Sequence, residues 1–148
     1  MNLLKNVRHF GIAVNNLETS LNFYQHLLGF KIVRSMDESG EYIDNMLSLN
    51  NVNVKTVKLS INDGITLIEL LQFKSHEGNS KKRNFFDCGA SHLALTVYDL
   101  DECYNELKKN GVKFNSKPQH SPDGFAKVVF CKDPDGTPVE LVQVLNEV

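Results

Sequence analysis

Two histidines and two glutamates stand out by type and spacing as residues that can do chemistry. His9 and His92 each open a short apolar segment. Glu69 and Glu140 each lie inside another apolar segment, where a lone carboxylate is costly unless it is paired or bound to a metal. Taken singly, each residue is more simply an edge or surface residue. As a matched set of two imidazoles and two carboxylates, they predict a site for a divalent metal.

An internal repeat places the four residues at equivalent positions. Residues 9–17 (HFGIAVNNL) match residues 92–100 (HLALTVYDL) at an offset of 83, and apolar residues alternate after each histidine. Residues 63–70 (DGITLIEL) match residues 135–141 (DGTPVEL) with one residue inserted. Because Asp-Gly favours a tight turn, a strand carrying the glutamate is expected after each turn.

The segments between these motifs predict a helix in each half. Apolar residues recur at helical spacing after Asn16 and Asp99, which are good N-caps, and stop at Gly29 and Gly111. Further strands are expected at residues 30–33, 54–59, 112–114 and 126–131, and a loop at 118–124.

Each half therefore reads strand, helix, strand, strand, strand. We expect an α+β fold of two βαβββ modules, over residues 1–73 and 91–148, joined by a polar linker over residues 74–90.

Side chains alternate between the two faces of a strand, so the face that carries each histidine otherwise carries only small residues. These neighbours are Gly11, Ala13, Ala94 and Thr96. Small side chains leave the space that a ligand cavity needs. If the halves pack with pseudo-twofold symmetry, the histidines and glutamates converge on one point.

Length, charge and cysteine content limit the classes of protein to which the chain can belong. The chain has 148 residues, about the length of one ordinary domain, and its formal net charge is −2. This charge excludes a polycationic nucleic-acid or membrane binder. No apolar run approaches the ~20 residues of a membrane span, and residues 1–8 do not resemble a signal peptide. Three cysteines without a C-x-x-C motif indicate reduced thiols in a cytoplasmic protein.

On these motifs the sequence resembles the vicinal oxygen chelate superfamily, the group of glyoxalases, bleomycin-resistance proteins and extradiol dioxygenases. The resemblance spans about residues 7–145 and rests on five segments. They are residues 9–20, 23–24, 28–30, 92–95 and 133–141. The resemblance implies that the two modules form a curled mixed sheet around a metal cavity. It also implies that the metal ligands are His9, Glu69, His92 and Glu140. This set is closest to glyoxalase I and to methylmalonyl-CoA epimerase, which has an amide-bearing residue in place of Glu69.

Two features depart from short bacterial glyoxalase I. Ala13 and Phe73 stand where that enzyme has an arginine and an asparagine that contact glutathione. The first half also contains an extra stretch, residues 39–47, which we expect to cover the site.

The resemblance implies a metal-dependent lyase or isomerase that moves a proton next to a metal-bound carbonyl, with Glu140 and Glu69 as the catalytic carboxylates. We expect one divalent ion per site, Zn²⁺, Ni²⁺, Co²⁺ or Mn²⁺ rather than Fe²⁺, and a small-molecule substrate with adjacent oxygens. We also expect a homodimer without a nucleic-acid or membrane partner. Two alternatives stay open: a non-haem iron dioxygenase, and a binding or resistance protein without turnover. Pairing of the modules within one chain or between two chains is also open.

Overall fold

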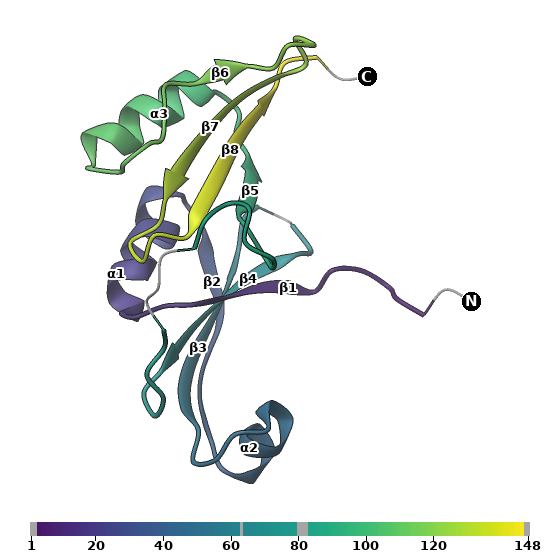
Figure 1. Cartoon of the computed structure of the whole chain (residues 1–148), viewed down its shortest axis with the longest axis vertical. Helices are drawn as coiled ribbons and strands as arrows, with labels where there is room; N and C mark the ends of the chain where they lie inside the picture. Colours follow the sequence, from purple (N-terminus) through teal and green to yellow (C-terminus); the bar gives the residue numbers. More distant parts are fainter. Residues whose placement is uncertain (1–2, 63, 80–82, 147–148) are drawn as a thin grey trace. The chain divides into compact units, whose positions relative to one another are not determined.

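The computed structural model of the chain describes residues 3–62, 64–79 and 83–146. The chain divides into two compact units, residues 1–80 and 81–148, and each unit has its own four-stranded sheet (Figure 1). Asp63 of the first predicted Asp-Gly turn and residues 80–82 of the predicted linker lie outside the described residues. None of the described helices has the length and apolar character that crossing a bilayer requires.

The described residues of the first unit form four strands and three helical segments. In chain order they are β1 (His9–Ala13), α1 (Leu17–Leu21), the π-helical segment η1 (Asn22–Leu27), β2 (Lys31–Ser39), α2 (Glu41–Leu47), β3 (Asn53–Ser60) and β4 (Leu67–Phe73). The sheet order is β1-β4-β3-β2, in which β1 runs parallel to β4 and the other pairs are antiparallel.

The second unit repeats this topology with fewer helical segments. It contains β5 (Leu93–Thr96), α3 (Leu100–Lys109), β6 (Gln119–His120), β7 (Ala126–Lys132) and β8 (Pro138–Val144). The sheet order is β5-β8-β7-β6, and β5 runs parallel to β8. The predicted α+β class with two βαβββ modules is confirmed.

Matching contacts in the two modules tie the glutamate strand to the helix that follows the histidine strand. The side-chain oxygen of Gln72 accepts a hydrogen bond from the Leu17 N–H (3.0 Å), at the start of α1. That of Gln143 accepts one from the Leu100 N–H (2.9 Å), at the start of α3. Each contact satisfies a backbone donor that a helix start leaves unpaired.

The predicted N-caps are confirmed. The Asn16 carboxamide accepts from the Thr19 N–H (2.8 Å), and the Asp99 carboxylate accepts from the Glu102 N–H (2.9 Å). Because each cap fixes where the chain turns from strand into helix, the end of each histidine strand is set locally.

The predicted helix over residues 17–28 is only partly α-helical. The Leu28 N–H donates to the Phe23 carbonyl, an i to i+5 bond of 3.0 Å that marks the π-helical segment. Phe23 and Tyr24 are both buried there, with their rings edge to face at 5.0 Å. The wider turn accompanies burial of two consecutive aromatic residues, which regular α-helical spacing does not predict.

Strand boundaries in the second module differ from the prediction. Residues 112–114 form no strand: Phe114 makes a single bridge to Cys131, and its ring packs on Tyr104 of α3 at 4.5 Å. The short strand β6 falls instead within residues 118–124, where a loop was predicted. Packing against the helix therefore determines the path of this segment, and its apolar alternation does not.

Helix α2 occupies the extra stretch of the first module, where no helix was predicted. Its Ile43 is buried with Val52 and Val54, and Leu71 and Phe73 of β4 pack against this cluster. Leu71 lies two residues from Glu69 and therefore on the same face of β4. The helix thus packs on the sheet face that carries Glu69.

Candidate metal centre

The first module pairs His9 with Glu69. Strand β1 lies parallel to β4 with Gly11 opposite Glu69, so His9 and Glu69 share a face one step apart. The His9 Nε2 is 3.0 Å from the Glu69 Oε2. The side chains are 32% and 13% exposed, so the pair is reachable from solvent but mostly enclosed by protein. Gly11 has no side chain, and a Cβ at this position would lie 3.4 Å from the Leu71 side chain.

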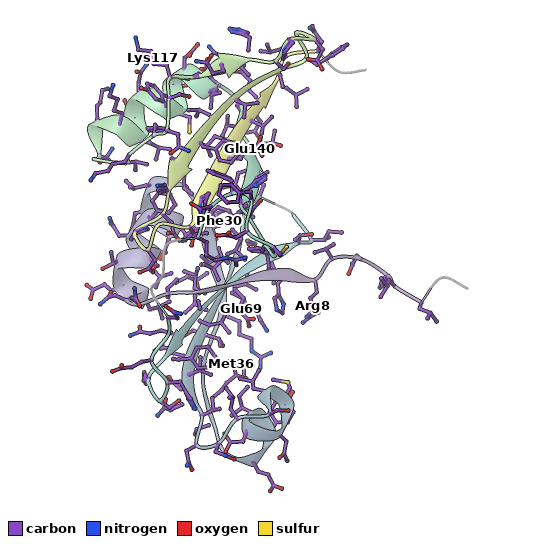
Figure 2. All side chains as sticks on the ribbon, viewed as in Figure 1. Arg8, Phe30, Met36, Glu69, Lys117 and Glu140 are labelled. Carbon is purple, nitrogen blue, oxygen red and sulfur yellow. The ribbon has the colours of Figure 1, made fainter. Side chains whose placement is uncertain are left out.

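The second module pairs His92 with Glu140 in the same way. Ala94 of β5 stands opposite Glu140 of β8, and the His92 Nε2 is 3.1 Å from the Glu140 Oε2. Figure 2 labels Glu69 on β4 and Glu140 on β8, each among the side chains of its own sheet. Strand alternation holds in both modules: Ile68, Leu70, Val139 and Leu141, the residues that flank the glutamates, are buried on the opposite face.

The Nδ1 atoms of the two histidines, which face away from the glutamates, have different surroundings. The Nδ1 of His92 lies 2.6 Å from the Ser91 hydroxyl, which orients the ring. The Nδ1 of His9 is buried and has no hydrogen-bond partner among the described residues. An unpaired buried nitrogen is unfavourable by about 1–3 kcal/mol. The described protein groups therefore leave the His9 Nδ1 without a partner, whereas the His9 Nε2 is the ring nitrogen that faces Glu69.

Each module thus supplies one nitrogen and one oxygen donor that already point toward each other. Such N and O donors fit a borderline divalent ion. A hydrogen bond to the second ring nitrogen, as between Ser91 and His92, orients the imidazole in the way that is usual for metal-ligating histidines. Within the described ranges, no group of three or more His, Cys, Asp or Glu side chains is gathered into a metal site. The structure brings the four predicted residues together as two pairs, one in each unit.

The next strand of each sheet breaks the symmetry between the pairs. Lys58 of β3 stands opposite Glu69, and its Nζ is 3.5 Å from the Glu69 Oε1. The equivalent residue opposite Glu140 is Phe130 of β7. Glu69 therefore has an ionic neighbour and Glu140 an aromatic one.

Phe130 belongs to a small aromatic cluster around the second histidine. Its ring meets the His92 ring edge to face at 5.2 Å and the Phe85 ring at 5.2 Å. Edge-to-face contacts of this kind hold the imidazole in place.

Sequence reasoning missed both Lys58 and Phe130. Aligning the two halves backward from the glutamates would have paired these residues, but the residue inserted in the first hairpin hides the match. The strand register, which the structure supplies, is what identifies them.

The family model and the related sequences point to the same protein family. The model of the Glyoxalase/Bleomycin resistance protein/Dioxygenase superfamily matches residues 6–141. The uncharacterised protein YwkD of Bacillus subtilis is 31% identical over 144 residues, which cover 95% of this chain and 98% of YwkD. A lactoylglutathione lyase of Neisseria meningitidis is 29% identical over 137 residues, which cover 91% and 88% of the two chains.

Solved structures agree on the fold. A glyoxalase family protein from Bacillus cereus matches with a TM-score of 0.87 at 20% identity, covering 98% of this chain and 97% of that one. The trypanothione-dependent glyoxalase I of Leishmania major matches with a TM-score of 0.69 at 25% identity, covering 95% and 87%.

Proposed function

Because the chain belongs to the Glyoxalase/Bleomycin resistance protein/Dioxygenase superfamily, we propose that it is a metal-dependent lyase or isomerase that moves a proton on the carbon next to a substrate carbonyl. The observation that carries this proposal is the pair of equivalent contacts, His9 to Glu69 at 3.0 Å and His92 to Glu140 at 3.1 Å. Similarity to lactoylglutathione lyases across nearly the whole chain supports the reaction class.

His9, Glu69, His92 and Glu140 together would hold one divalent ion, Zn²⁺, Ni²⁺, Co²⁺ or Mn²⁺ rather than Fe²⁺. Each module supplies half of the ligands, so the centre is complete only when two modules face each other, in one chain or in a homodimer. When bound, the ion acts as a Lewis acid on the substrate carbonyl and makes the neighbouring C–H more acidic.

Glu140 is the residue that we assign to proton transfer. One of its carboxylate oxygens faces the His92 Nε2, and its cross-strand neighbour Phe130 is apolar. Among the described residues, no lysine or arginine pairs with this carboxylate in the way that Lys58 pairs with Glu69. A carboxylate without a fixed cationic partner is free to take a proton from carbon and return it elsewhere.

Glu69 is the residue that we assign mainly to metal binding. Its two oxygens face the His9 Nε2 at 3.0 Å and the Lys58 Nζ at 3.5 Å. Because both of its oxygens already have a close partner, Glu69 is less free than Glu140 to take a proton, and we assign it a secondary part in proton transfer.

The positions associated with glutathione in bacterial glyoxalase I are apolar in this chain. Phe73 packs against the α2 cluster, and Ala13 offers no polar group. We therefore expect a substrate with adjacent oxygens whose other groups are recognised elsewhere on the site.

Isotope incorporation tests the proposal. The metal-loaded chain is incubated in D₂O with 2-oxoaldehyde–thiol hemithioacetals and with α-substituted acyl-CoA esters. We expect turnover of one class, with deuterium at the carbon next to the carbonyl. Consumption of O₂ with a catechol would instead assign the dioxygenase alternative, and tight binding without turnover would assign the binding-protein alternative.

A further inference from the structure

Lys58 has a position that metal binding by Glu69 does not explain. It lies on β3, an inner strand of the first sheet, and its side chain is only 21% exposed. Removing a cation from water is unfavourable, and an ammonium 3.5 Å from the Glu69 carboxylate competes with a metal for that oxygen. Phe130 at the equivalent place shows that the fold does not need a cation there.

Two further cations lie on the same sheet face as Lys58. Arg34 of β2 stands opposite Lys58, and Lys31 stands opposite Ser60, two residues along β3. A register shift between Ile32 and Arg34 inserts one residue in β2, and this bulge places both cations on the face of Lys58. One cross-strand row therefore runs Arg34, Lys58, Glu69 and Gly11.

Edge-strand cations alone have a simpler explanation, since charges on an edge prevent sheets from joining. Protection of the sheet edge explains the charges of Lys31 and Arg34 on the edge strand β2. It does not explain Lys58, because β3 is an inner strand. Lys55, on the opposite face of β3, is already paired with Asp37 at 3.6 Å. Lys58 is thus the cation that lies beside the candidate site and is not accounted for by the sheet edge.

We propose that Lys58, supported by Arg34, selects substrates that carry an anionic substituent, a carboxylate or a phosphate, next to their chelating oxygens. This inference rests on the proposed metal-dependent function. When the Glu69 carboxylate ligates a divalent ion, the ion takes up much of the negative charge that the Lys58 ammonium now faces. The carboxylates of Glu69 and Glu140 balance the ion's two charges, so the charge of Lys58 is left for the substrate to neutralise.

Matched chelators test the inference in the cobalt-loaded full chain. Succinic acid monohydroxamate and its methyl ester chelate through the same two oxygens but differ in one charge, and phosphonoacetohydroxamate offers a phosphonate instead. We expect the wild-type chain to bind at least one acid roughly tenfold more tightly than the ester, the scale of one charge-assisted hydrogen bond. Whichever acid binds more tightly identifies the oxyanion.

Three variants identify the residue responsible. Lys58→Met should abolish the preference without weakening cobalt binding, because it removes a competitor for Glu69. Lys58→Arg should keep the preference. Lys55→Met is the matched control, since Lys55 lies on the same strand and pairs with a carboxylate on the opposite face. It should behave as wild type.

The outcomes separate this inference from the proposed function. If cobalt binds but the wild type treats acids and ester alike, the inference is wrong and the metal site stands. If Lys58→Met weakens cobalt binding, Lys58 only supports Glu69, and the inference is wrong as well. If the wild type binds no cobalt, the proposed function fails and the inference fails with it.

Discussion

Glu69 and Glu140 are equivalent in the repeat but have different neighbours. Lys58 and His9 engage both oxygens of Glu69, whereas Glu140 faces His92 and has Phe130 as its cross-strand neighbour. Local surroundings are what separate the roles of two carboxylates in a shared site. At the residue scale, therefore, the two glutamates should respond differently to the same substitution.

Glu140→Gln should retain metal and lose activity by roughly two to four orders of magnitude, the scale of general-base catalysis. Glutamine can still coordinate through its oxygen but cannot accept the proton. Glu69→Gln should lose less activity, because Glu69 acts mainly as a ligand. The measurements are kcat with the substrate class found in D₂O and metal content by elemental analysis.

Glu38→Gln is the control for these two variants. Glu38 lies on β2 and accepts a hydrogen bond from the Thr56 hydroxyl at 3.1 Å, which glutamine also accepts. It should keep wild-type activity. Full activity in both Glu69→Gln and Glu140→Gln would contradict the proton-transfer assignment.

At the scale of elements, the glutamine contacts fix each helix to the strand that carries the glutamate. The Leu100 N–H is bound by Gln143, and Leu100 is fully buried. Removing the side-chain acceptor leaves a buried donor unpaired. Gln143→Ala should therefore lower the free energy of unfolding by about 1–2 kcal/mol.

Urea denaturation measures this change, and Gln119→Ala is a suitable control. The Gln119 side chain is exposed and, among the described residues, bonds only the nearby Lys117 carbonyl, so its loss should lower stability by no more than about 0.5 kcal/mol. Equal stability of Gln143→Ala and wild type would show that the helix start does not depend on this contact.

Helices and strands that are marked by a capping residue or by apolar alternation were predictable from the sequence. The strands that begin at or just after the histidines, and the helices capped by Asn16 and Asp99, follow from alternation and capping chemistry. Helix α2 was not predictable, because Gly40 at its start offers no capping side chain and Ser48 at its end adopts a left-handed conformation with φ 54°. Packing of Ile43 on the sheet stabilises it instead.

The sequence singles out the four candidate residues, but it does not identify the residues around them. His9, Glu69, His92 and Glu140 carry the repeat, and the strand register brings them together as the two observed pairs. The residues that distinguish these pairs lie on a neighbouring strand. Identifying them requires the strand register, which pattern and propensity do not supply.

At the scale of the whole molecule, the chain consists of two units that each contain one His–Glu pair, half of the proposed ligand set. Two ligands are too few for a stable structural or catalytic site, which normally has three or four protein ligands. The proposed function therefore requires modules to combine, within a chain or in the homodimer that we expect. In either arrangement the number of metal ions equals the number of chains.

The metal content of three proteins tests the central claim most directly. Wild type, His9→Ala and His92→Ala are expressed with Ni, Co, Zn and Mn supplements and measured by elemental analysis, with circular dichroism to confirm folding. Both histidines are about one-third exposed, so truncation should leave the fold intact. The account predicts one divalent ion per chain in the wild type and little or none in either variant. A wild type that stays metal-free on titration, or a His9→Ala or His92→Ala protein that keeps its full metal content, would contradict it.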